Sequence, residues 1–194
     1  MISAPSGAGK TTLGGELLKK MPELYYSVSV TTRPPRRGEK NGQDYYFISE
    51  KEFIERKNAG ELIECAQVHG YWYGTPRDFL IKNLKFGHDI LLDIDVQGGR
   101  QIKKLFPGAV LIFIAPPSMS ILESRLRGRH QDDEAAIQKR LKAAQNEIEA
   151  ASDYDYLILN EQVSQAVEQL RCIIVAERAK MSRSNLCIIW PKLS

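Results

Sequence analysis

The sequence predicts an α/β protein with a three-layer core on a parallel sheet, a small mixed α/β insertion and a helical lid. Two observations indicate this fold class. A glycine-rich loop at the start of the chain leads directly into a helical apolar stripe, and in the second half apolar strands alternate with amphipathic helices. The 194 residues, 43% of them apolar, are enough for one core of ordinary size, so a single domain is expected.

The composition excludes several classes of protein. Lysine and arginine number 27 against 24 aspartates and glutamates, a formal charge of +3, so a polycationic nucleic-acid coat and an acidic disordered tail are both excluded. The three cysteines, Cys65, Cys172 and Cys187, are too far apart for a C-x-x-C pair, which favours a reduced cytoplasm. No apolar run approaches the ~20 residues of a membrane span. We therefore expect a cytoplasmic protein without nucleic-acid or membrane partners.

The first segment is a small-residue loop at 3–12, followed by a helix whose buried stripe contains Leu13, Leu17 and Leu18. Only Met1 and Ile2 remain for the strand that should precede this loop, whereas strands usually have about five residues. The sequence therefore predicts that several residues precede the given start.

The next segment reads as a small mixed sheet with one helix. The β-branched and aromatic residues of 26–32 and the residues of 43–48 predict two strands. Ser49 to Glu52 has capping-box spacing, so a helix should run to about residue 59 and end at Gly60. Residues 62–68 and 71–73 predict a hairpin around His69-Gly70.

The rest of the chain alternates between strands and helices. Nearly continuous apolar runs predict strands that are covered on both faces of a parallel sheet. The expected strands are 88–95, 110–115 and 156–159, and the expected helices are 77–86, 98–105, 119–127, 133–151 and 163–180. No linker separates these segments, so one folding unit is predicted, with a core of 1–28 and 88–194, an insertion of about 29–87 and a lid of about 125–145.

A phosphate-binding loop is the clearest motif. Ala4, Gly9, Lys10 and Thr11 match G-x-x-x-x-G-K-[ST], except that Ala4 replaces the first glycine. The backbone and side chains expected around the phosphates of ATP are Ser6, Gly7, Ala8, Gly9, Lys10, Thr11 and Thr12. Lys10 would reach the β- and γ-phosphates, and the Thr11 hydroxyl would bind Mg²⁺. A flexible Gly/Ser turn with a chance lysine is the alternative, but the position just before a helix favours a P-loop.

A second cationic pocket distinguishes a kinase from a GTPase switch. Arg33 and Arg36 flank two prolines, and Tyr45 follows nine residues after Arg36. Arginine forks pair bidentately with phosphate and prolines stiffen the turn that presents them. These residues predict a site for a phosphate-bearing acceptor.

With both motifs in place, the chain resembles the guanylate kinase family, which transfers a phosphoryl group from ATP to GMP. The matching stretches are 3–13, 27–47, 61–75, 92–98, 116–129 and, more loosely, 139–160. The resemblance covers nearly the whole chain in the right order. It implies ATP and GMP as substrates and Mg²⁺ as the cofactor.

The resemblance also implies roles for residues of the acceptor site. It places Arg33, Arg36 and Tyr45 on the GMP phosphate, with Tyr73 near the same phosphate. It places Glu64 and Thr75 on guanine, with Ser29 assisting. A carboxylate can accept from guanine N1–H and the 2-amino group, which adenine does not offer, and such pairing can discriminate by roughly 10⁴-fold.

Two aspartates follow the apolar run 90–92. Residues two apart on a strand share a face, so Asp93 and Asp95 should both face the crevice at the carboxyl end of the sheet. The resemblance places Asp93 on guanine and Asp95 in the Mg²⁺ shell, although the division of roles between them stays open. Helix-capping or turn carboxylates are the alternative.

The basic stretch at 125–129 and the following helix resemble the family's lid over ATP. The resemblance implies that Arg129 and Arg140, together with Lys10, stabilise the charge of the transferring phosphoryl group. It places Asn160 near adenine. Two other functions remain open: an inactive guanylate kinase-like module that binds phosphopeptides, and a kinase for another small phosphate acceptor. The sequence determines neither the oligomeric state nor the acceptance of dGMP.

Overall fold

The computed structural model describes residues 1–128 and 133–183. The strands are β1 (Ile2–Ser3), β2 (Tyr25–Ser27), β3 (Val30–Thr31), β4 (Tyr46–Phe47), β5 (Leu62–Val68), β6 (Tyr71–Pro76), β7 (Ile90–Leu92), β8 (Ile112–Ala115) and β9 (Tyr156–Leu159). The α-helices are α1 (Lys10–Lys20), α2 (Glu50–Asn58), α3 (Arg77–Lys85), α4 (Val96–Leu105), α5 (Met119–Arg127), α6 (Glu134–Glu149) and α7 (Val163–Arg178). Two short 3-10 turns follow α6 and α7.

The core strands are parallel, as the sequence predicts. β1, β8 and β9 pair in the order β1-β8-β9, and β2 pairs with β7. A parallel bridge between Ile2 and Asp93 joins the two groups, so the strands follow one another as β2, β7, β1, β8, β9. The carboxyl ends of β1 and β7 therefore lie next to each other, where open α/β sheets bind ligands.

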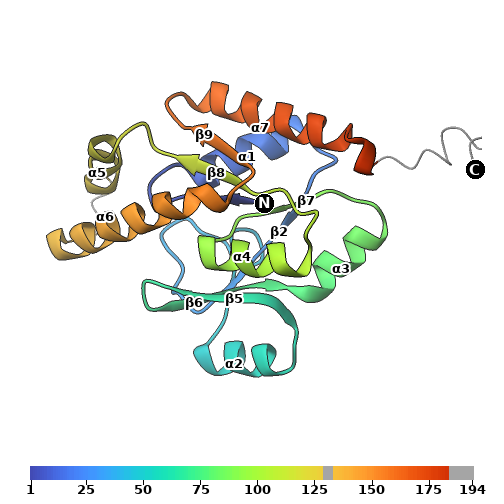
Figure 1. The fold of residues 1–194 in the computed structure, drawn as a ribbon. Helices are drawn as coiled ribbons and strands as arrows, with labels where there is room; N and C mark the ends of the chain where they lie inside the picture. The colour runs from blue at the N-terminus through green and yellow to red at the C-terminus, as the bar shows by residue number, and fades with distance from the viewer. Residues whose placement is uncertain (129–132, 184–194) are drawn as a thin grey trace, which may run out of the picture.

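Helices cover both faces of this sheet (Figure 1). On one face, α1 and α7 pack through Leu13, Leu17 and Leu170 onto Ile112 and Ile114 of the sheet. On the other face, α3 and α4 form a second buried cluster with β7 and β5. The three-layer core expected from the alternation of strands and helices is confirmed.

A second sheet lies beyond α4, with α2 at its far side (Figure 1). Its strand order is β4-β3-β6-β5, and it is mixed because β3 is parallel to β4 but antiparallel to β6. The predicted hairpin is present as β5 and β6, with His69 at φ +50 in its turn. Phe53 of α2 is fully buried against Val30 and Leu62, and the Ser49 hydroxyl accepts from the backbone N–H of Glu52 as a helix cap.

The prediction of a single strand over 26–32 is wrong. β2 pairs with β7 in the core sheet, whereas β3 pairs with β6 in the mixed sheet, so the chain crosses between sheets at residues 28–29. The strand expected at 43–48 is also shorter, because the side chains of Asn41 and Asp44 bond nearby backbone N–H groups and form a turn there. Residue propensities favour extended backbone in both segments, but they do not specify which sheet a residue joins.

The helices α5 and α6 pack against each other through Leu122, Leu126 and Ala144. Arg127 at the end of α5 pairs with Glu123 and Glu134, which ties the two helices together at their exposed surface. Across the part of the chain that the structure describes, no helix has the length and apolar character needed to cross a membrane.

Candidate functional site

One crevice collects most of the residues that the sequence analysis singled out. It opens between the phosphate loop, the mixed sheet, the end of β7 and helix α6. Its lining consists of Ala4, Pro5, Ser6, Gly7, Gly9, Lys10, Thr11, Thr12, Ser29, Arg33, Arg36, Tyr45, Glu64, Val68, His69, Tyr73, Asp93, Ile94, Asp95 and Glu147. The two anion-binding motifs therefore contribute to the same crevice.

The phosphate loop depends on its glycines for its shape. Gly9, which precedes α1, has φ +97, a left-handed conformation that side chains with a Cβ rarely adopt. A Cβ on Gly9 would lie 2.3 Å from the Asn160 side-chain nitrogen, which donates at 2.7 Å to the carbonyl of Ala8. No side chain caps the first turn of α1. Its backbone N–H groups and the positive end of the helix dipole are therefore directed toward an anion.

Lys10 is the charged side chain of this loop. Its ammonium group lies 2.6 Å from a carboxylate oxygen of Asp93 and donates to the carbonyl of Ile94 at 3.1 Å. Burial by itself lowers the pKa of Lys10, but the charge and hydrogen bond of Asp93 outweigh burial and raise it. Lys10 is thus held as a full positive charge at the mouth of the loop.

The two predicted acceptor arginines differ in exposure. The Arg33 side chain is 8% exposed, donates at 2.8 Å to Glu39 and lies over the rings of Tyr45 and Phe47. Arg36 is exposed, and its backbone N–H donates to the other oxygen of Glu39. Glu39 therefore fixes the turn that presents both arginines. This role of Glu39 was not predicted, although an acid three residues after Arg36 was a signal in the sequence.

Two tyrosines close this side of the crevice. The rings of Tyr45 and Tyr73 meet edge to face with centroids 5.9 Å apart. Burial, and next the negative charge of Asp93, raise the pKa of Tyr45 to about 12, so its hydroxyl keeps its proton. Tyr45 can therefore donate a hydrogen bond to a phosphate oxygen near Arg33.

Glu64 is a buried acid on β5. Its carboxylate accepts a 2.7 Å hydrogen bond from the Thr75 hydroxyl of β6, and the residue is 4% exposed. Burial raises the pKa of Glu64 to about 7, although the Thr75 bond opposes the shift. Thr75 is fully buried behind Glu64 and does not line the crevice. The hydroxyl thus orients the carboxylate, while Ser29 lines the crevice directly.

Asp93 and Asp95 face the crevice from different backbone contexts. β7 ends at Leu92, so the strand alternation used to predict a shared face does not extend through both residues. Asp93 pairs with Lys10, whereas Asp95 is the N-cap of α4 and accepts from the Gly98 N–H at 2.9 Å. The capping alternative thus applies to Asp95, which also lines the crevice.

The neighbourhood of Gly98 places Asp95 beside Glu64. A Cβ on Gly98 would lie 2.6 Å from one oxygen of Glu64 and 3.3 Å from a carboxylate oxygen of Asp95. Burial is the main cause that raises the pKa of Glu64, and the negative charge of Asp95 raises it further, while the Thr75 bond lowers it. Asp93 therefore pairs directly with Lys10, whereas Asp95 lies beside Glu64, although the charge of Asp95 also acts on Lys10.

Three further predicted residues lie behind the lining or on helix α6. Ala8 is a buried residue of the phosphate loop, and the buried Asn160 side chain donates to its carbonyl and so holds the loop rather than lining the crevice. Its contact with adenine stays a prediction. Arg140 is a half-buried residue of α6, and Arg129 lies outside the described residues. Glu147 of α6 also lines the crevice, although it was not predicted as a site residue from the sequence.

The donor set suits a hard divalent cation. The Thr11 hydroxyl and the carboxylates of Asp93 and Asp95 supply oxygen ligands, which Mg²⁺ prefers. Within residues 1–128 and 133–183, no three His, Cys, Asp or Glu side chains converge closely enough to hold a metal by themselves.

Comparison with known proteins gives one consistent result. Residues 1–177 match the family model described as guanylate kinase. The chain is 49% identical over 183 residues to the guanylate kinase of Geobacter sulfurreducens, covering 94% of this chain and 90% of that protein. It is 47% identical over 174 residues to the guanylate kinase of a Synechococcus strain, covering 90% of this chain and 80% of that protein. The crystal structure of guanylate kinase from Anaplasma phagocytophilum superposes with a TM-score of 0.79 at 39% identity, covering 94% of this chain and 86% of that one.

Proposed function

The chain belongs to the guanylate kinase family, and on that premise we propose how its crevice phosphorylates GMP. The enzyme is an ATP:GMP phosphotransferase. An oxygen of the GMP phosphate attacks the γ-phosphorus of ATP while the bond from that phosphorus to the β-phosphate oxygen breaks, giving GDP and ADP. The observation that supports the assignment of sites most strongly is the single crevice shared by the glycine-lined loop and the paired arginines.

The phosphate loop is the proposed donor site. Its backbone N–H groups, Lys10 and the start of α1 hold the β- and γ-phosphates. Lys10 leaves Asp93 for the phosphates when ATP binds, because phosphate oxygens offer it a stronger negative charge. Thr11 and a carboxylate would hold Mg²⁺, which would neutralise part of the phosphate charge. Arg140 of α6 adds positive charge near the same group, and the same role for Arg129 stays a prediction.

The mixed sheet is the proposed acceptor site. The side chains that hold the GMP phosphate are Arg33, Arg36 and Tyr45. The ion pair with Glu39 orders the Arg33 side chain before GMP binds. No general base is required, because the attacking phosphate oxygen is already anionic near neutral pH.

For the base, we infer a division of roles that reverses the sequence-based one. Glu64 accepts from guanine N1–H and the 2-amino group, and Asp95, which is close to Glu64, assists on the guanine side. Asp93, which pairs with Lys10, serves the phosphates and Mg²⁺. The inactive phosphopeptide module has no support, since Gly7, Gly9, Lys10 and Thr11 are all present and line one crevice.

A coupled ADP-release assay over GMP, AMP, CMP and UMP tests both the acceptor and this division. We expect GMP to be preferred by several orders of magnitude in the wild type, as buried polar recognition allows. Asp95→Asn should weaken that preference about tenfold or more. Asp93→Asn should keep the preference and lower kcat. Equal wild-type rates with AMP would refute the guanine assignment, and loss of preference in Asp93→Asn alone would restore the original roles.

A further inference from the structure

Glu147 is an acid on the lid helix that no step above uses. On α6 it shares a stripe with Ile137, Arg140 and Ala144, at helical spacings of three and four residues. Ile137 and Ala144 are buried against the protein, so this stripe is the inward face of the helix. Glu147 lines the crevice together with Lys10 and Asp95. Its carboxylate is therefore part of the proposed nucleotide site, although it lies on α6 and not on the phosphate loop.

The Glu147 carboxylate has no evident stabilising contact in the ligand-free protein. Within the described chain it forms no hydrogen bond and no ion pair. Burial raises its pKa to about 7, Lys10 acts to lower it and Asp95 acts to raise it. An unpaired, half-buried acid is unfavourable unless a ligand compensates it. Helix packing alone would be served better by an apolar or amide side chain.

The neighbouring charges restrict what the ligand can be. The site must accept a highly anionic triphosphate, and a carboxylate facing phosphate oxygens repels them. Lys10 pairs with Asp93 in the free protein and would pair with the phosphates after binding, so its charge offsets that of Glu147 only in part. A cation that arrives with the nucleotide removes this conflict. Mg²⁺ keeps several water ligands on phosphates, and such waters donate hydrogen bonds to nearby carboxylates.

We propose that Glu147 makes the donor site selective for the metal-bound nucleotide, attracting Mg²⁺ through its water ligands and repelling nucleotide that carries no metal. This inference rests on the proposed donor site. It adds a specificity residue that the phosphate-loop motif does not contain.

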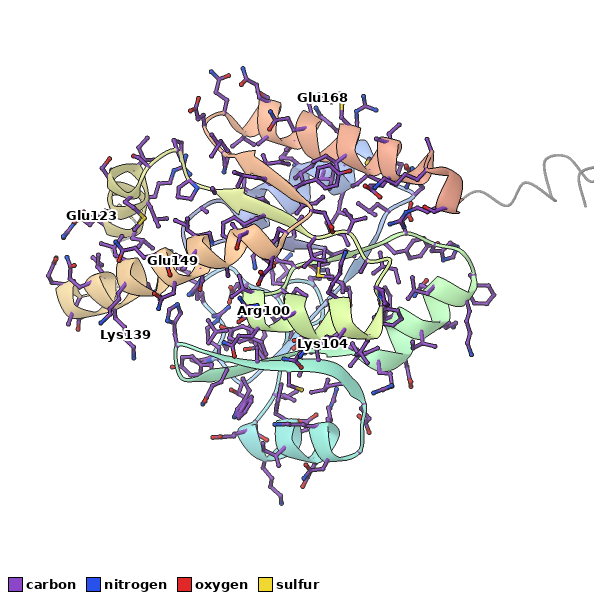
Figure 2. The ribbon with its side chains drawn as sticks, viewed as in Figure 1. Arg100, Lys104, Glu123, Lys139, Glu149 and Glu168 are labelled. Atoms are coloured by element: carbon purple, nitrogen blue, oxygen red, sulfur yellow. The ribbon has the colours of Figure 1, made fainter. Side chains whose placement is uncertain are left out.

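The test is calorimetric titration with ADP, once with saturating Mg²⁺ and once with EDTA. It compares the wild type, Glu147→Gln and the control Glu149→Gln. Glu149 lies two residues further on the same helix (Figure 2) and is exposed. The amide keeps the size of the side chain and removes its charge.

We expect opposite changes in the two titrations. Glu147→Gln should bind metal-free ADP more tightly, because a repulsive charge is gone, and Mg·ADP more weakly. The ratio of the two dissociation constants should shrink about tenfold, the effect of one charge a few ångströms away at a partly screened site. Glu149→Gln should leave both constants unchanged.

Changes of equal size and sign in both titrations would overturn the inference, since a merely structural role weakens both complexes alike. An unchanged ratio would overturn it as well. Wild-type protein that binds no ADP under either condition would instead refute the donor site itself, so the two failures are distinguishable.

Discussion

The two ends of the crevice are held in place by different kinds of contact. The phosphate loop is fixed by its backbone: Gly9 has a left-handed conformation, and the Asn160 side-chain amide donates a hydrogen bond to the Ala8 carbonyl. The acceptor pocket is fixed by pairs of side chains, Arg33 with Glu39 and Glu64 with Thr75. A site made of backbone tolerates little added volume, whereas a site made of side chains can change its selectivity without losing its fold. Substitutions should therefore affect the two ends in different ways.

The largest effect should come from Lys10→Ala at the donor end. This change removes the positive charge that meets the phosphates, so we expect kcat to fall by about 10³-fold, as when one preorganised donor is lost. Steady-state assays at saturating ATP and GMP measure it, with circular dichroism to show that the fold persists. Lys19→Ala on the exposed side of the same helix is the control. A loss below tenfold would contradict a role for Lys10 in transfer.

Gly9→Ala tests whether the loop is held by its backbone. Its Cβ would meet the Asn160 side chain at 2.3 Å, in a backbone region unfavourable for alanine. We expect ADP affinity to fall roughly 10²-fold from misplaced N–H groups, and unfolding to become easier by about 1–3 kcal/mol.

Gly15→Ala is the matched control for this change. Gly15 lies inside α1 with open space around its Cβ position, so alanine should stabilise the helix by roughly 0.5–1 kcal/mol. Urea denaturation and ADP titration compare the two variants. Equal stability of both would show that the Gly9 conformation is not required.

The smallest effect concerns the acceptor end and its pH dependence. The pKa of Glu64 in the folded protein is about 7, above its ordinary value of 4.5. The folded state therefore binds more protons than the unfolded state between these values. The stability that Glu64 contributes is present below about pH 4.5 and is lost as pH rises through 7.

Glu64→Gln removes this contribution. Between pH 5 and pH 8 the free energy of unfolding should fall less in the variant than in the wild type, by on the order of 2 kcal/mol. Urea denaturation at each pH measures both curves, and Glu147 titrates in both proteins and cancels. Parallel curves would show that Glu64 is ionised throughout.

Much of the core could be predicted from short-range patterns. The β8 run and the α5 stripe are contiguous in sequence, and their patterns predicted a strand at 110–115 and a helix at 119–127, where the structure has them at 112–115 and 119–127. The crossing between β2 and β3 was not predictable in this way, because the same β-branched residues suit either sheet. Glu147 was missed for a related reason: its helix was expected, but the partner of each helix face depends on distant strands.

The sequence by itself determined the phosphate loop, the arginine pair and the order of strands and helices outside residues 26–32, because each depends on neighbours within a few residues. Only the tertiary structure decided which aspartate meets Lys10, which carboxylate stands beside Glu64, and that Asn160 supports Ala8 from 152 positions away. These pairings are set by the sheet order β2, β7, β1, β8, β9, and no local pattern specifies the register in which distant strands meet.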